Sequence, residues 1–149
     1  MRARAVSRAI AVVLFASFSS VAAAQSGEPA GLTDADRSQI RAVIERQMTA
    51  FRADDEAGAF ALASPAIQAM FVTPEAFMNM VKSGYQPVYR PKVVEFQEIV
   101  QLDGAPVQRV YVVGPDGVPT IALYPMQRQP DGSWRINGCY LVPTDDRTT

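Results

Sequence analysis

The densest group of carboxylates in the chain is the run Asp54-Asp55-Glu56. A carboxylate here could act as a general base if burial raised its pKa, or it could contribute to a weak calcium site. No D-x-D-x-D-G loop surrounds the run, so the usual sequence pattern of a calcium site is missing. The same residue types are also typical of a helix cap and a solvated turn, and the sequence favours this plainer interpretation.

Aromatic residues in the second half of the chain suggest another kind of site, because ligand pockets are often lined by aromatic side chains with a few polar groups. The same large side chains also make ordinary hydrophobic core, which is the commoner arrangement. If a cleft combined them with the acidic run, we expect its ligand-binding residues to be Tyr85, Phe96, Tyr111, Tyr124, Trp134, Asp54 and Asp55.

Histidine is absent from the chain. This excludes Ser-His-Asp triads, Cys-His pairs and histidine-based zinc sites. Three nearby methionines, Met70, Met78 and Met80, could hold copper(I), but methionine is also a good filler of cores. No glycine-rich phosphate loop is present, since the glycine-containing turns stand between strand patterns without a following helix. We therefore expect no metal, no cofactor and no assigned catalytic residue.

Cys139 is the only cysteine, so no disulfide can form within one chain. A free cysteine is most often buried, and we expect that of Cys139. An intermolecular disulfide and a reactive thiol are the alternatives.

The first 24 residues have the three zones of a secretory signal peptide. Three arginines (Arg2, Arg4 and Arg8) precede an apolar run, and small residues lead to a cleavage site at Ala24-Gln25. The apolar run is about half of the roughly 20 residues that span a bilayer. We therefore expect cleavage, no permanent membrane span, and a periplasmic or secreted protein.

Cleavage would leave 125 of the 149 residues, enough for one domain with a real core. Because three arginines leave with the signal peptide, 11 basic residues then face 15 acidic ones, a net charge of −4. Nucleic-acid binding normally needs a basic surface, so we do not expect it. The predicted layout is a signal peptide (1–24), a linker (25–32), one α+β domain (33–143) and a flexible tail (144–149).

The first half of the domain carries helix patterns. Thr33 is a helix cap, and apolar residues follow it at three- and four-residue spacing on one predicted buried face. That face consists of Ile40, Val43, Ile44, Met48 and Phe51. Ser64-Pro65 and Thr73-Pro74 each combine a capping side chain with proline at the first helical position, which predicts two further helix starts.

The second half carries strand patterns. Four β-rich segments, 93–102, 107–113, 120–128 and 134–142, are separated by short turns such as Asp131-Gly132. Close spacing predicts a four-stranded antiparallel meander covered by the helices. In the last segment Trp134, Ile136, Gly138 and Tyr140 share a face unless a bulge intervenes. A glycine within a strand is typical of such a bulge or a bend.

The chain resembles an uncharacterised bacterial family, domain of unknown function 4864, over nearly all of its length after the predicted cleavage site. The resemblance implies no activity, because the family has none assigned. Its matching stretches include residues 50–55, Ala59-Phe60, Ala63-Ser64-Pro65, Ile67-Gln68, Met80-Val81, Gly84-Tyr85, Tyr124 and residues 131–139.

More distantly, the layout is similar to the nuclear-transport-factor-2-like (SnoaL-like) cone superfamily. Those domains also begin with an amphipathic helix that ends near an acidic residue, and they finish on an Asp-Gly-x-Trp-Arg-Ile strand, here residues 131–136. The resemblance implies a cone with a cleft, and it implies a possible homodimer through the outer face of the sheet. The superfamily contains isomerases, dehydratases and non-catalytic binding domains, so fold alone does not choose a function.

Three hypotheses follow. The preferred one is an exported binding or accessory domain, not an enzyme, whose partner is a small apolar ligand or a protein. The second is an acid–base enzyme resembling the ketosteroid isomerases, with Asp54 or Asp55 abstracting a proton and Tyr124 donating to the developing oxyanion. The third is a structural protein that self-associates.

Overall fold

The computed structural model describes residues 31–144, so the predicted signal peptide and most of the predicted linker and tail lie outside the described residues. Helices come first and strands follow, as the sequence predicts for an α+β domain. The helices are α1 (Asp34–Arg52), α2 (Glu56–Ala61), α3 (Pro65–Phe71), α4 (Pro74–Gly84) and α5 (Gln86–Tyr89). The strands are β1 (Val93–Leu102), β2 (Ala105–Val113), β3 (Pro119–Arg128), β4 (Trp134–Ile136) and β5 (Tyr140–Pro143).

The helix starts follow from local sequence. Thr33 and Asp36 form a capping box at the start of α1, in which each side chain satisfies a backbone N–H of the other residue. Ser64 and Thr73 cap α3 and α4, and a proline stands in the first turn of each helix. The three starts that the sequence predicts are therefore confirmed.

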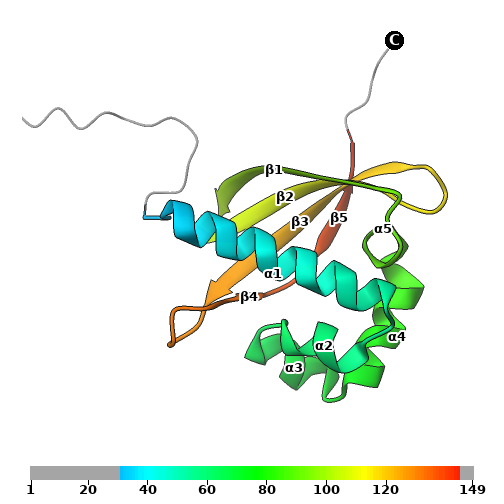
Figure 1. Cartoon of the computed structure of the whole chain (residues 1–149), viewed down its shortest axis with the longest axis horizontal. Helices are drawn as coiled ribbons and strands as arrows, with labels where there is room; N and C mark the ends of the chain where they lie inside the picture. The colour runs from blue at the N-terminus through cyan, green and yellow to red at the C-terminus, as the bar shows by residue number, and fades with distance from the viewer. Residues whose placement is uncertain (1–30, 145–149) are drawn as a thin grey trace, which may run out of the picture.

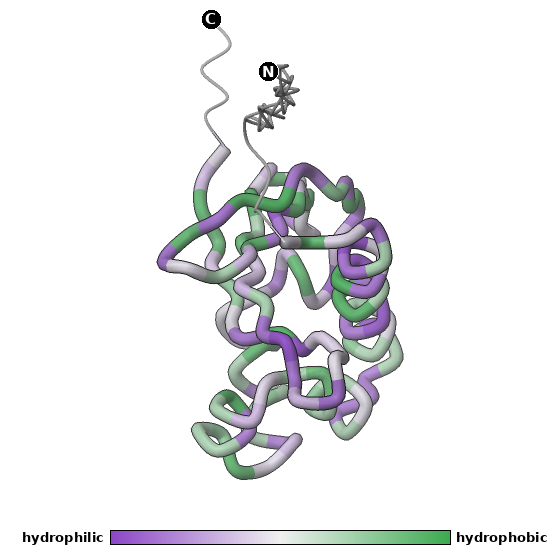
Figure 2. Tube along the Cα trace, turned by 90° about the vertical axis from the view of Figure 1, so that its left-hand side faces the viewer, coloured by the Kyte–Doolittle hydropathy of each residue, from purple (hydrophilic) through white to green (hydrophobic). Residues whose placement is uncertain are grey.

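Helix α1 crosses the sheet, and α2, α3 and α4 gather beyond one end of it (Figure 1). Hydrophobic and hydrophilic residues alternate along the helices (Figure 2), as amphipathic helices require. All five residues of the predicted α1 face are buried in one core with residues of β2, β3 and β4. None of the helices between residues 31 and 144 is long and apolar enough to cross a membrane.

The sheet is antiparallel, with the order β1-β2-β3-β4, and β5 also pairs with β3. The predicted antiparallel sheet is confirmed, and the segment predicted as its last strand is divided into β4 and β5. Met126 pairs with Ile136 and Leu123 pairs with Tyr140. Three residues of the last segment therefore lie opposite two residues of β3, which is a β-bulge.

Gly138 lies in this bulge, with a φ of +145° that L side chains rarely adopt. The extra residue shifts the register, so Tyr140 pairs with Leu123 instead of Ala122. Trp134 and Ile136 stay buried, whereas Tyr140 is 62% exposed. The shared face expected for an unbroken strand therefore ends at the bulge.

Candidate functional site

A pocket with a volume of about 520 Å³ lies between the helices and the bulged end of the sheet. Helix α3 contributes Ala66, Ile67, Met70 and Phe71 to its wall, and α4 contributes Phe77, Met80 and Val81. The opposite wall comes from Tyr124 on β3 and from residues 136–140. The pocket is therefore mostly apolar, with a few polar groups near the bulge.

The connection between α2 and α3 fastens the helical wall to the sheet. The Ser64 backbone N–H donates to the carbonyl of Ile136 at 2.8 Å, and the Ile136 N–H donates to Leu62 at 3.0 Å. The fully buried Ser64 hydroxyl also donates to Asn137 Oδ1 at 2.7 Å. These bonds join residues that are more than seventy positions apart in the sequence. They hold the α2–α3 connection, and with it the helical wall, against the sheet wall.

Tyr124 and Cys139 are the central polar pair of the sheet wall. Tyr124 is 1% exposed, and its hydroxyl makes no hydrogen bond of normal geometry among residues 31–144, although Cys139 is a weak hydrogen-bonding neighbour. Burial raises the pKa of Tyr124 well above its usual 10, and the neighbouring Cys139 raises it further. Burial also raises the pKa of the Cys139 thiol to about 12. Both groups are therefore neutral at physiological pH, and Cys139 lacks the thiolate character of a reactive cysteine.

Two exposed apolar side chains mark the open side of the pocket. Met70 is 70% exposed and Tyr140 is 62% exposed, although both contribute to the pocket wall. Helix α3 as a whole has no buried residue. The pocket therefore opens to solvent beside α3 and the start of β5.

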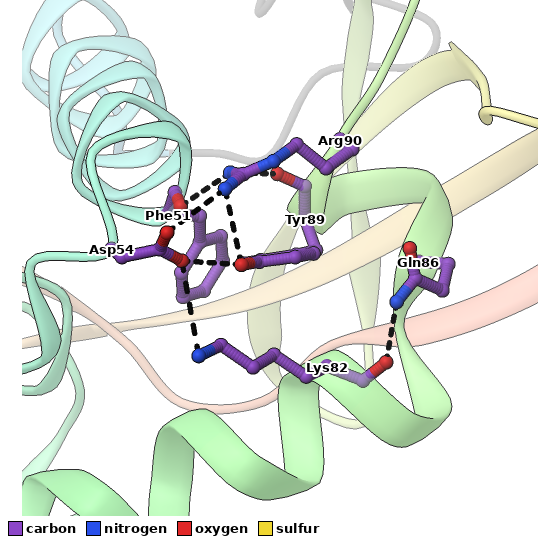
Figure 3. A network of polar contacts seen from close by, with 6 residues as sticks. All are labelled: Phe51, Asp54, Lys82, Gln86, Tyr89 and Arg90. Atoms are coloured by element: carbon purple, nitrogen blue, oxygen red, sulfur yellow. Dashed lines mark hydrogen bonds and ion pairs between the residues drawn. The ribbon is translucent and has the colours of Figure 1, made fainter.

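Asp54 belongs to a polar network outside the pocket (Figure 3). The Tyr89 hydroxyl donates to Asp54 Oδ1, Arg90 Nη2 lies 3.2 Å from Oδ2, and Lys82 Nζ lies 3.9 Å from Oδ1. Arg90 also donates to the carbonyl of Phe51 at 2.6 Å. The Tyr89 hydrogen bond and then the two cationic charges lower the pKa of Asp54. The network joins the end of α1 to α4 and α5.

The acidic run does not supply a base to the pocket. Asp55 caps α2 by accepting from the Gly58 N–H at 3.0 Å, which is the plainer interpretation of the sequence. Neither Asp54 nor Asp55 lines the pocket. Neither carboxylate is therefore placed to take a proton from a ligand in the pocket, as the acid–base hypothesis requires.

The structure brings together only two of the seven predicted binding residues, Tyr85 and Tyr124, in the pocket. Phe96 lies in a groove between α1 and β1, where the Arg41 guanidinium stacks 4.7 Å from its ring. Tyr111 is half-buried on β2, one position from the core residues Val110 and Val112 and so on the opposite face of the sheet.

Trp134 is the first residue of β4. It lies in the core and does not line the pocket. Its indole N–H donates to Asp36 at 3.2 Å, and Arg128 stacks on its ring at 4.6 Å. Trp134 is therefore a core residue. Its expected part in the site falls instead to the later residues of the same segment, from Ile136 to Tyr140.

The residues of α3 and α4 that line the pocket were not among the predicted site residues. Their apolar spacing is the same as that of core-facing helices. Besides Tyr85 and Tyr124, the sequence signals near the site were the lone Cys139 and a glycine within a strand, Gly138. Cys139 was expected to be buried, and the structure leaves it half-buried.

A family model described as "Domain of unknown function (DUF4864)" matches residues 33–149. Comparison with curated proteins and with solved structures finds no significant match. The matched range includes every residue that lines the pocket.

Proposed function

Because the chain belongs to the family described as domain of unknown function DUF4864, whose description names no activity, we propose a function from the geometry: a small binding domain that holds an apolar ligand. The observation that carries this proposal is the pocket of about 520 Å³ with its mostly apolar wall. Ligand pockets typically have volumes of about 300–1,000 Å³ and apolar walls with a few polar groups. Protein interiors are otherwise closely packed, so a space of this size favours binding over a purely structural role.

The chemistry of the wall supports binding rather than catalysis. No Asp, Glu, Lys or Arg is among the described residues that line the pocket. The neutral Tyr124 and Cys139 are poor bases, and the chain has no histidine. The pocket therefore offers no group suited to proton abstraction near neutral pH.

The binding proposal is tested with N-phenyl-1-naphthylamine, a neutral apolar dye whose fluorescence rises in an apolar environment. We expect saturable binding to the wild-type protein. Ala66→Trp, which fills the pocket from α3, should weaken binding at least tenfold. Ala69→Trp is the matched control, because Ala69 is exposed on the same helix and does not line the pocket. Wild-type protein without saturable binding, or equal binding by both variants, would contradict the proposal.

We also propose that the protein is exported and cleaved near Ala24-Gln25. The charge and hydropathy pattern of residues 1–24 supports this, as do the small residues before the cleavage site. Sequencing the N-terminus of the protein recovered from the periplasm or the medium tests it. A recovered chain that still begins at Met1 would contradict cleavage.

A relation to the nuclear-transport-factor-2-like cone superfamily is a further proposal. Helices on one face of an antiparallel sheet, with a pocket between the two layers, support it. That superfamily's pairing mode would place a second copy on the outer face of the sheet. Tyr111, Ile121 and Leu123 lie on that face by their register, and Val93 at its edge is 40% exposed.

The proposed homodimer is tested by sedimentation equilibrium over a wide concentration range. We expect a mass that rises towards twice that of one chain, and Leu123→Lys should shift the equilibrium towards the monomer. A monomeric mass at the highest concentration would exclude this pairing. It would leave the pocket proposal intact, because the two sites lie on opposite faces of the sheet.

A further inference from the structure

The Tyr124 hydroxyl is buried and makes no hydrogen bond of normal geometry in the part of the chain that the structure describes, although the Cys139 thiol is a weak hydrogen-bonding neighbour. The large majority of buried polar side-chain atoms do make such a hydrogen bond. An unpartnered hydroxyl lowers stability, yet an apolar phenylalanine would fill nearly the same space. Because Tyr124 lines the pocket, its unsatisfied hydroxyl points to a bound ligand as the missing partner.

The two amide side chains of the wall already have protein partners. Gln47 donates through Nε2 to the carbonyl of Ala59 at 3.2 Å. Asn137 Oδ1 accepts from the Ser64 hydroxyl at 2.7 Å. The neighbouring Cys139 offers only a weak S–H donor and a weak sulfur acceptor. The hydroxyls of Tyr85 and Tyr140 also belong to the wall, but Tyr85 is half-buried and Tyr140 is 62% exposed. Tyr124 is therefore the fully buried hydroxyl of the wall that remains for a ligand.

The electrostatics of the pocket select against charge. The described residues that line it include no Lys, Arg, Asp or Glu, and the nearby cations Lys82 and Arg90 are paired with Asp54 instead. An ionised ligand group next to Tyr124 would be buried without a counter-charge, which is strongly unfavourable. Because burial raises the pKa of Tyr124 well above 10, the hydroxyl keeps its proton at neutral pH and can donate it to an acceptor.

The residues at the open side of the pocket indicate the chemistry of the rest of the ligand. From the bulge, the wall continues through apolar residues of α3 and α4 to the exposed Met70 and Tyr140. A ligand that reaches Tyr124 therefore passes mostly apolar side chains on its way in. Its body must be apolar and its one polar group must lie at the leading end.

Resting on the binding function proposed above, we propose that the ligand is an uncharged, largely apolar molecule with a terminal hydrogen-bond-accepting oxygen, such as a ketone, and that the Tyr124 hydroxyl donates to this oxygen. Tyr124 thereby sets specificity, while the apolar walls supply most of the affinity. This assigns a ligand class and a polar anchor to the pocket.

Three probes with the same ring system test the inference by displacement of N-phenyl-1-naphthylamine. They are 2-acetylnaphthalene, a neutral ketone; 2-ethylnaphthalene, which lacks the oxygen; and 2-naphthoate, which is charged. We expect the wild-type protein to bind the ketone at least fivefold more tightly than the hydrocarbon, and the carboxylate most weakly. Tyr124→Phe should reduce the ketone preference to about one and leave hydrocarbon binding unchanged.

Tyr111→Phe is the matched control, because it loses the same atom and Tyr111 lies outside the pocket, on the opposite face of the sheet. It should keep the ketone preference. A spectroscopic measurement on the wild-type protein needs no variant: the infrared carbonyl stretch of bound 2-acetylnaphthalene should lie below its frequency in hexane, because a hydrogen bond weakens the C=O bond. A stretch at the hexane frequency would overturn the inference even if Tyr124→Phe failed to fold.

The outcomes separate this inference from the binding proposal. Absence of binding by the dye and by all three naphthalenes overturns both. Binding of the hydrocarbon and the ketone with equal affinity, or a ketone preference that survives in Tyr124→Phe, overturns the role of Tyr124 and leaves apolar binding standing. Tight binding of 2-naphthoate would show that the ligand class is wrong.

Discussion

Replacing Gly138 by alanine tests whether the bulge between β4 and β5 depends on the backbone conformation of this residue. Gly138 has a φ of +145°, in a region that is nearly restricted to glycine. A Cβ atom built there would meet Pro125 Cγ and Tyr140 Cε2 at 3.9 Å, which is ordinary contact. The substitution therefore isolates backbone strain from steric overlap.

The expected loss follows from two opposing effects. A non-glycine residue held in such a region costs about 1–3 kcal/mol. Alanine also restricts the unfolded chain, which offsets roughly 0.4–1 kcal/mol. We expect Gly138→Ala to lower the free energy of unfolding by about 1–2 kcal/mol, an appreciable part of the roughly 5–15 kcal/mol of a typical domain. Gly138→Val should lose at least as much, because its branched side chain is larger.

Urea unfolding followed by the fluorescence of Trp134, the only tryptophan, measures this loss. Gly84→Ala is the control: Gly84 ends α4, has open space around it and does not have a positive φ. Its substitution should be neutral or stabilising by up to about 1 kcal/mol. A Gly138→Ala protein within about 0.5 kcal/mol of wild type, the usual range of surface substitutions, would refute the strain argument.

Two further predictions concern α1. Phe51→Ala should lower the free energy of unfolding by about 3–5 kcal/mol, because Phe51 is 2% exposed and packs on Phe77 and Tyr89 with ring centroids 6.3 and 6.4 Å away; an unchanged melting temperature would contradict this packing. Hydrogen bonds from the Thr33 backbone N–H and the Trp134 indole, together with Arg128, hold the pKa of Asp36 well below its usual value. The stability that Asp36 contributes is therefore present above a pH of about 4 and is lost as the pH falls towards the folded-state pKa. Asp36→Asn should be less stable than wild type at pH 7, and the difference should narrow on acidification; a constant difference from pH 7 to pH 2 would exclude the carboxylate as its source.

The local parts of the fold could be predicted because neighbouring residues determine them. Ser64 and Thr73 each cap a helix through a hydrogen bond to an N–H three residues later, so the sequence alone contains both partners. The buried face of α1 follows from apolar spacing in the same way. The sequence predicts the bulge only as an alternative to an unbroken strand. Gly138 permits a bulge, but the pairing of β3 with β4 and β5 determines the register.

The structure places most of the predicted site residues apart from one another, because local sequence does not determine which distant segments meet. Asp54 and Asp55 are adjacent to α1 and α2, where local capping and the Tyr89 hydrogen bond engage them. Phe96 and Tyr111 have the residue type of a pocket wall, but their strand positions place them elsewhere. Residue type indicates that a side chain prefers apolar surroundings, without indicating which surroundings it finds.

The sequence by itself determined the order of helices and strands, the helix starts, the buried face of α1 and the absence of histidine chemistry. Only the tertiary structure decided that α3 and α4 stand apart from the bulge and enclose a pocket. The walls of a pocket and the residues of a core have the same apolar pattern, since both remove the same side chains from water. The space between the helices and the sheet depends on contacts between residues far apart in the sequence, such as Ser64 with Asn137 and Asp36 with Trp134. No local sequence pattern contains these contacts.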